Sequence, residues 1–116
     1  MIKRGDIFWA EFAPRSGSEQ TGVRPALVLS DDRMNVNPRW RSIVVVPFST
    51  SAAQARRGPT AIAIAPGSSG LTRESVALCH QITTLDRSKF RQRIGTLDFA
   101  SMTAVEDGVR AALDMG

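Results

Sequence analysis

The chain of 116 residues has very few of the side chains that cross-link a fold or hold a metal. Cys79 is the single cysteine and His80 the single histidine, so the sequence excludes an internal disulfide and any zinc site built from cysteines and histidines. No apolar run approaches the roughly 20 residues of a membrane-spanning helix, and charges interrupt the first dozen residues, where a signal peptide needs an apolar segment. We therefore expect a cytoplasmic protein without a disulfide scaffold, a zinc scaffold or membrane contact.

Acidic side chains are missing from the middle of the chain. From Arg33 to Arg73 there are six arginines and no aspartate or glutamate, and 13 of the 15 basic residues of the whole chain are arginine. A guanidinium group binds phosphate through two parallel hydrogen bonds and stacks on bases. This segment therefore predicts a polyanion-binding track, such as one for RNA, although a solvated surface that aids solubility would give the same charge count. Residues 87–93 add four basic side chains, whereas the C-terminal segment is acidic.

Hydrophobic patterning predicts several short strands followed by one helix in a single domain, residues 1–116. In the C-terminal segment Met102, Val105, Val109 and Leu113 recur at helical spacing, and Asp98 is a suitable N-cap. Asp86 can cap a short helical turn over residues 87–90. We expect a mainly β (α+β) fold, a small β-barrel with the helix laid against it. The expected strands are residues 6–12, 26–30, 42–48, 60–65, 75–83 and 92–97.

Several motifs, taken in order and spacing, resemble the MazF/PemK family of toxin endoribonucleases. They cover most of the chain, which makes the resemblance far more specific than a single short motif. The motifs are RGDIFWAEF (residues 4–12), GSEQ (17–20), RPALVLS (24–30), VPFST (46–50) and SVALCHQI (75–82).

The resemblance implies an SH3-like β-barrel that forms a homodimer and is held inactive by a cognate antitoxin, as the toxin of a type II toxin–antitoxin system. It implies cleavage of single-stranded RNA at short sequences, which blocks translation. The resemblance implies that no metal or other cofactor is needed, because internal attack of the ribose hydroxyl or related acid–base chemistry cleaves the phosphodiester. The expected products carry a cyclic phosphate or a 3′-phosphate on one side and a 5′-hydroxyl on the other.

Four residues are the catalytic candidates. Arg24 matches the family's catalytic arginine, and a guanidinium stays charged at every working pH. Ser49 stands where the family has a threonine, with Thr50 beside it, so either hydroxyl could contact the scissile phosphate. His80 precedes Gln81 where the family commonly has a carboxylate. A histidine could serve there as general acid or base, or be structural, or stack on a base.

The RNA-binding candidates lie in loops and at strand ends. The loop with Ser18, Glu19 and Gln20 matches the family's loop that closes over RNA, and an ordinary polar loop is its alternative interpretation. Gln81 can hydrogen-bond base edges. Trp40 is a candidate for base stacking, whereas Trp9 is expected in the core, and so is Cys79. Arg15, Arg56 and Arg57 are candidate contacts to the RNA backbone.

Two other classes of function compete with the nuclease. One is a toxin of the same fold that poisons a protein target such as gyrase, and the other is a module that binds RNA without cutting it. The gyrase-inhibiting relatives act through C-terminal residues, so Arg24 together with Ser49 favours the nuclease.

Overall fold

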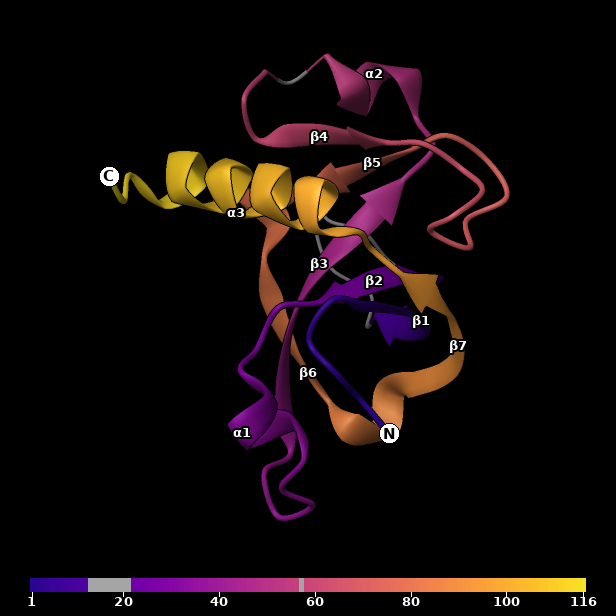
Figure 1. Cartoon of the computed structure of the whole chain (residues 1–116), viewed down its shortest axis with the longest axis vertical. Helices are drawn as coiled ribbons and strands as arrows, with labels where there is room; N and C mark the ends of the chain where they lie inside the picture. The colour runs from indigo at the N-terminus through magenta and orange to yellow at the C-terminus, as the bar shows by residue number, and fades with distance from the viewer. Residues whose placement is uncertain (13–21, 57) are drawn as a thin grey trace.

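Seven strands and one long helix make up most of the fold (Figure 1). The structure is a computed structural model of the chain and describes residues 1–12, 22–56 and 58–116. All the strand pairings are antiparallel. The strands are β1 (Asp6–Phe12), β2 (Gly22–Val28), β3 (Ser42–Ser49), β4 (Ala61–Ile64), β5 (Ser75–Leu78), β6 (Thr83–Asp86) and β7 (Phe90–Thr96), and the helix is α3 (Phe99–Leu113).

The strands form one curved sheet in the order β4-β5-β3-β2-β1-β7, and β6 also pairs with β3. The end strands β4 and β7 do not pair with each other in the part of the chain described. The mainly β domain with a C-terminal helix is therefore confirmed, but hydrogen bonds do not close the sheet into a complete barrel. One core cluster lies between the sheet and α3, and a second lies on the other side of β1, where Phe8 packs edge-on against Phe90.

The predicted strand over residues 75–83 is wrong beyond Leu78. A 3-10 turn, Cys79–Gln81, separates β5 from β6. Both strands pair with β3, through Phe48↔Ala77 and Val45↔Thr83. From Phe48 back to Val45 is three residues on β3, whereas from Ala77 to Thr83 is six residues on the segment that pairs with it. The turn thus acts as a three-residue bulge, and it contacts α3. The run SVALCHQIT contains no glycine or proline, so nothing local signals the break.

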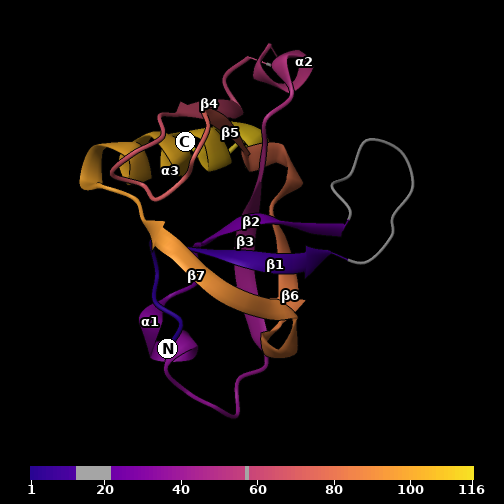
Figure 2. The same cartoon turned by 90° about the vertical axis from the view of Figure 1, so that its right-hand side faces the viewer.

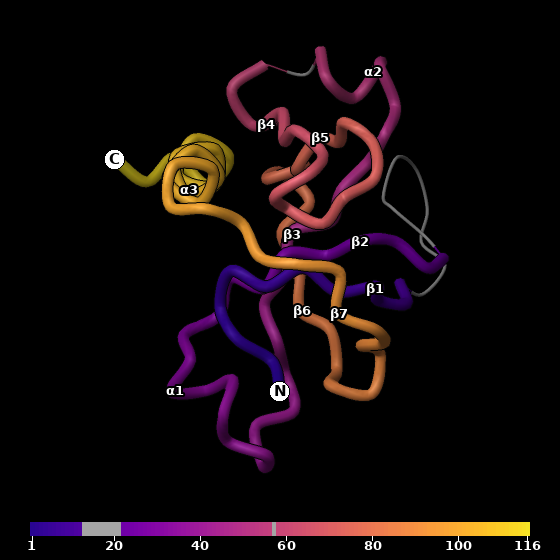
Figure 3. Tube along the Cα trace, turned by 45° about the vertical axis from the view of Figure 1, so that its right-hand side comes forward, coloured from indigo at the N-terminus to yellow at the C-terminus, as the bar shows by residue number. Residues whose placement is uncertain are grey.

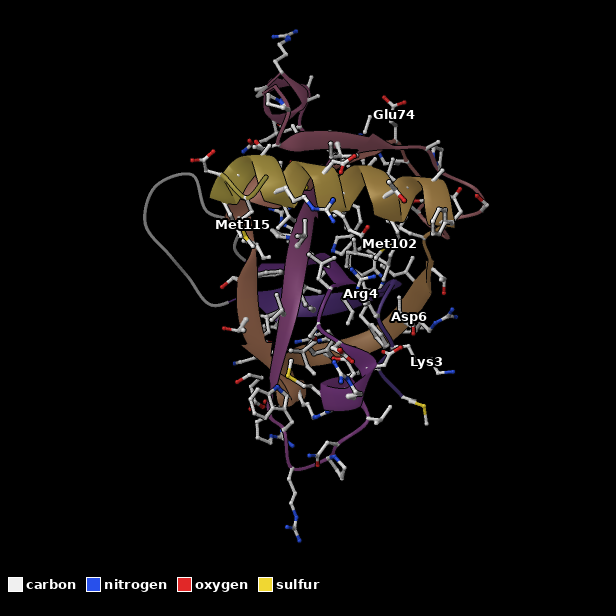
Figure 4. The ribbon with its side chains drawn as sticks, turned by 60° about the vertical axis from the view of Figure 1, so that its left-hand side comes forward. Lys3, Arg4, Asp6, Glu74, Met102 and Met115 are labelled. Carbon is white, nitrogen blue, oxygen red and sulfur yellow. The ribbon has the colours of Figure 1, made fainter. Side chains whose placement is uncertain are left out.

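Helix α3 begins and ends as its sequence predicts. The Asp98 side chain caps it by accepting from the Ser101 N–H at 2.7 Å. Met102 and Val105 are buried against the sheet, and Figure 4 labels Met102 on the side of the helix that faces the strands. Arg4 holds the same helix from the start of the chain, since it pairs with Glu106 at 2.7 Å.

Two short helices lie in segments predicted to be loops, at opposite ends of the molecule (Figure 2). They are α1 (Asp32–Asn35) and α2 (Ala52–Ala55). The Arg87 guanidinium fixes the chain after α1, because it donates to the backbone carbonyls of Met34, Asn35, Asn37 and Trp40. Arg87 belongs to the turn that Asp86 caps, Arg87–Lys89, as the sequence predicts.

Candidate functional site

An open pocket of about 410 Å³ lies where β1, β2, the end of β3, the segment before β5 and the middle of β7 converge. Its volume falls in the range of small-molecule and substrate sites. Strands from both ends of the sheet contribute, so the curvature of the sheet creates the pocket. Its lining residues are Trp9, Val23, Arg24, Pro25, Phe48, Ser49, Thr50, Gly70, Leu71, Thr72, Arg73, Ser75, Gln92, Arg93 and Ile94.

Arg24 and Ser49 meet across neighbouring strands. β2 and β3 pair as far as Ala26 opposite Pro47, so each residue lies two positions beyond this last pair of its strand. Both residues line the pocket. Ser49 is nearly buried and Thr50 is exposed. The structure therefore brings together three of the four catalytic candidates: a cation and two neighbouring hydroxyl groups.

The opposite wall of the pocket carries polar residues that the sequence did not single out. Thr72 and Arg73 come from the segment before β5, and Gln92 and Arg93 come from β7. Arg93 is partly neutralised, because its Nε lies 3.4 Å from the Asp6 carboxylate. Arg73 and Arg93 both belong to the basic segments of the sequence, but only the fold shows that they face Arg24.

A contact between two glycines holds this wall in place. A Cβ on Gly70 would lie 2.3 Å from the Ile94 carbonyl oxygen, and a Cβ on Gly95 would lie 2.1 Å from the Ser69 carbonyl oxygen. The connection from β4 to β5 thus rests backbone to backbone on β7, and Figure 3 shows that connection reaching toward the end of β7. Leu71 and the Ser69 hydroxyl anchor it further, since Leu71 is buried in the core and the hydroxyl donates to the Ala65 carbonyl at 3.0 Å.

The expectation that Trp9 belongs to the core is wrong. Its side chain lies on the pocket side of β1, opposite Pro25 on β2, and is 40% exposed. An indole at the rim of a cationic pocket offers a flat apolar surface on which a base can stack. Trp40, the other candidate for stacking, is also exposed, but it lies in the loop after α1 and does not line this pocket.

His80 and Gln81 lie in the turn between β5 and β6 and are not among the residues that line the pocket. The His80 Nδ1 atom is 3.4 Å from the Thr60 hydroxyl, and its Nε2 atom is 3.5 Å from the Gln81 amide nitrogen. The ring is half-buried beside α3 and β4. The fourth catalytic candidate therefore stands apart from Arg24 and Ser49 within one chain.

The remaining RNA-binding candidates divide into two groups. Arg56 is exposed after α2 and lines a second hollow next to the pocket. The other candidates, Arg15, Ser18, Glu19, Gln20 and Arg57, lie outside the described residues.

Many of the basic side chains have carboxylate partners that come from other segments. Arg41 pairs with Asp86 at 3.0 Å and Arg33 with Asp31 at 2.7 Å, although the sequence from Arg33 to Arg73 has no acid. The hydrogen bond from Arg33 lowers the pKa of Asp31 to about 2, and that from Arg41 holds the pKa of Asp86 well below its usual range.

Three of the four basic residues 87, 89, 91 and 93 also pair with carboxylates. Lys89 and Arg91 both pair with Glu11, whose pKa is lowered chiefly by the hydrogen bond from Arg91 and then by that from Lys89. Arg87 is held by carbonyl oxygens and Arg93 by Asp6. The two carboxylates, Glu11 and Asp6, thus offset part of the positive charge of this segment.

Two further observations concern the described residues as a whole. They contain no cluster of three or more histidine, cysteine, aspartate or glutamate side chains arranged to hold a metal ion. They also contain no helix that is long and apolar enough to span a membrane. Cys79 is buried as expected, and burial raises the pKa of its thiol to about 11.

Comparisons with known proteins agree with the fold. The family described as the PemK-like, MazF-like toxin of type II toxin–antitoxin systems matches residues 3–113. Endoribonuclease EndoA of Bacillus subtilis is 34% identical over 113 residues, 97% of this chain and 95% of that protein.

Two solved structures have the same fold. The MazE–MazF structure from Deinococcus radiodurans is 26% identical, with a TM-score of 0.74 over 99% of this chain and 97% of that one. A mycobacterial endoribonuclease solved with its cognate antitoxin is 22% identical, with a TM-score of 0.80 over 100% of this chain and 98% of that one.

Proposed function

We propose that this chain cuts single-stranded RNA in the pocket that holds Arg24 and Ser49. The premise is that the chain belongs to the PemK-like, MazF-like toxin family and is a type II toxin with endoribonuclease activity. The observation that carries the proposal is that Arg24 lines the same open pocket as the hydroxyl-bearing residues Ser49 and Thr50. Cleavage of messenger RNA at short sequences then blocks translation.

Arg24 provides the positive charge that the reaction needs. Attack on a phosphodiester gathers negative charge on the non-bridging oxygens, and a preorganised guanidinium can bind two of those oxygens at once. The ribose 2′-hydroxyl next to the scissile phosphate supplies the nucleophile, so neither a metal-bound water nor a cofactor is required. The 2′-oxygen loses its proton and bonds to phosphorus as the bond from phosphorus to the 5′-oxygen breaks, and the 5′-oxygen takes up a proton. The products are a 2′,3′-cyclic phosphate, which water can open to a 3′-phosphate, and a 5′-hydroxyl.

Ser49 and Thr50 provide a hydroxyl donor to the same phosphate. The Ser49 Oγ atom already accepts a hydrogen bond from the Ser51 N–H at 3.1 Å. That bond orients the oxygen and leaves its proton free to be donated. Ser49, fixed by this bond and nearly buried, is better preorganised than the exposed Thr50, and we assign it the principal contact.

Trp9 and Arg73 bind the RNA on either side of the reacting phosphate. The indole offers a stacking surface for a base, and the Arg73 guanidinium faces the pocket from the opposite wall. Stacking tolerates any base, so sequence preference comes from polar groups that contact base edges, with Gln92 of the pocket and Gln81 as candidates.

A cognate antitoxin inhibits the enzyme. The MazF of Deinococcus radiodurans is solved together with MazE, and this supports a partner of the same kind for the present chain. We further propose that the toxin acts as a homodimer in the cytoplasm, where its messenger RNA substrate is found. A dimer is also the arrangement in which His80 and Gln81 could contact RNA that is bound mainly by the other copy.

The test is cleavage of a long RNA by the purified chain in the presence of EDTA, with the new 5′ ends mapped by primer extension. We expect cuts at a repeated short sequence, and we expect Arg24→Ala to abolish them. Arg110→Ala is the matched control, because Arg110 lies on α3, pairs with Asp107 and does not line the pocket. RNA that stays intact with the unmodified chain, or cuts that persist in Arg24→Ala, would contradict the proposal.

A further inference from the structure

A second hollow adjoins the pocket on the side of α2. It has a volume of about 410 Å³ and opens to solvent, and this volume again falls in the range of binding sites. We call it the α2 hollow and define it by six of its residues: Ser51, Ala52, Ala55, Arg56, Arg73 and Glu74.

The α2 hollow and the pocket form one continuous groove. Thr50 and Arg73 line both of them, so these two residues lie at the boundary between the two. An RNA strand whose scissile phosphate lies beside Arg24 extends beyond the pocket in both directions. On one side, its next nucleotide meets the α2 hollow.

The cations of the α2 hollow have no carboxylate partner among the described residues. Six other arginines are held in ion pairs with carboxylates: Arg4, Arg33, Arg41, Arg91, Arg93 and Arg110. Arg56 and Arg73 form no such pair there, although Glu74 follows Arg73 directly and lines the same hollow. In Figure 4 Glu74 projects away from the ribbon at the edge of the fold. Two guanidinium groups without such a pair beside one groove favour an anion with several oxygen atoms, such as phosphate.

The rest of the α2 hollow suits a nucleoside better than a bare anion. The small side chains of Ala52 and Ala55 and the edge of Val76 give an apolar surface that can accept a sugar or a base. The Ser51 hydroxyl and the Glu74 carboxylate can accept hydrogen bonds from a ribose 2′-hydroxyl or a base amino group. Apolar surface, acceptors and cations together match one nucleotide with its flanking phosphates.

We propose that the α2 hollow binds the nucleotide next to the cleaved dinucleotide, with Arg73 and Arg56 on its phosphate groups. This inference rests on the proposed function, because it takes the pocket beside it as the place of RNA cleavage. Arg56 and Arg73 are binding residues in it and take no part in the chemical step. The α2 hollow increases the affinity for longer RNA and leaves the rate at which bound RNA is cleaved unchanged.

Binding to a fluorescent RNA tests the proposal independently of cleavage. The Arg24→Ala protein is titrated into a fluorescent dinucleotide, which can fill the pocket but not the α2 hollow, and into an RNA of about 16 nucleotides, the upper end of the usual site sizes of single-strand binders. Adding Arg56→Ala should weaken binding of the longer RNA roughly tenfold and reduce its salt slope by about 0.7 for each phosphate that the protein no longer neutralises. Binding of the shorter RNA should not change, and Arg110→Ala should leave both affinities unchanged. Because Arg56 is exposed, its replacement leaves the fold intact.

Kinetics on the otherwise unmodified chain give the second readout. Arg56→Ala should raise KM for the longer RNA, keep kcat, and leave the shorter RNA unaffected. In the titration, equal affinity of the Arg24→Ala protein and of the double variant with Arg56→Ala for the longer RNA would overturn the proposal. So would a loss that Arg110→Ala reproduces, or weaker binding of the antitoxin with RNA binding unchanged, which would mark a protein-docking surface. A chain that cuts no RNA at all contradicts the proposed function, whereas the binding titration still decides on the α2 hollow.

Discussion

At the scale of single residues, the chemistry of the pocket depends on which hydroxyl group reaches the phosphate. Ser49 and Thr50 are adjacent in the chain, but only Ser49 is paired in the sheet, opposite Val76 of β5. Its position is therefore set by backbone hydrogen bonds on β5 and by the bond to its own oxygen from the Ser51 N–H. Thr50 follows the strand and is exposed.

Replacing Ser49 by alanine should lower kcat by about 100-fold, which is the usual effect of removing one preorganised donor to a developing negative charge. KM should change little, because the hydroxyl matters most in the transition state. Single-turnover cleavage of a mapped RNA measures both. The matched variant Thr50→Ala should keep most of the activity, and a larger loss in Thr50→Ala than in Ser49→Ala would reverse the assignment.

His80 gives a second prediction at this scale. Its ring contacts Thr60 and Gln81 and does not line the pocket of its own chain. We therefore expect His80→Asn to leave the shape of the pH–rate profile unchanged, even if it raises KM. Loss of one limb of the profile would instead establish His80 as a general acid or base, and would mean that it reaches the RNA bound to a second copy.

At the scale of elements, the pocket wall depends on the contact between the β4–β5 connection and β7. We predict that Gly95→Ala destabilises the protein by about 1–3 kcal/mol, as overpacking usually does, because the new Cβ meets the Ser69 carbonyl oxygen. The displaced connection carries Arg73, so KM for RNA should also rise. Thermal unfolding and cleavage kinetics check the two effects.

Gly67→Ala is the control for this prediction. Gly67 lies in the same connection with a φ of +100°, but a Cβ there would meet nothing within 4 Å. It introduces backbone strain without a clash, so it should lower stability with a smaller effect on KM. If both variants raise KM equally, the contact between Gly70 and Gly95 does not determine the position of the pocket wall that carries Arg73.

The elements that the sequence predicts well are those whose signals are local. Strand β1 shows alternation and α3 shows helical spacing with the Asp98 cap, and both are found close to their predicted bounds. The turn at Cys79–Gln81 has no such signal, because pairing of both flanking strands with β3 and contact with α3 impose it. In the same way, motif resemblance points to Arg24 and Ser49, whereas Trp9, Arg73 and Gln92 join them only through the curvature of the sheet.

At the scale of the whole molecule, ion pairs between carboxylates and basic side chains make stability depend on pH. The folded-state pKa values of Asp31, Asp86 and Glu11 lie below their ordinary values because of hydrogen bonds from basic side chains. A lowered folded-state pKa means that the folded state favours the ionised carboxylate. The stabilisation is therefore complete above the ordinary pKa near 4 and is lost as the pH falls. For Asp31 the loss extends down to about pH 2.

We predict that the urea midpoint of unfolding falls steadily between about pH 5 and pH 2. Each exposed pair contributes little on its own, so the decline reflects several of them. Asp86→Asn should flatten part of the pH dependence, since it removes the carboxylate that pairs with Arg41. A midpoint that stays constant or rises on acidification would show that these pairs do not stabilise the fold.

The loop after α1 is held by the guanidinium of Arg87, a residue that lies about fifty positions later in the sequence. Its four carbonyl acceptors all lie between Met34 and Trp40, and its own N–H donates to the Arg41 carbonyl at 2.9 Å. The loop after α1 has backbone hydrogen bonds of its own, from Asn37 to Met34 and from Trp40 to Asn37, but the Arg87 contacts require β6 to be paired with β3. During synthesis this loop therefore lacks its guanidinium anchor until the chain has emerged beyond residue 87.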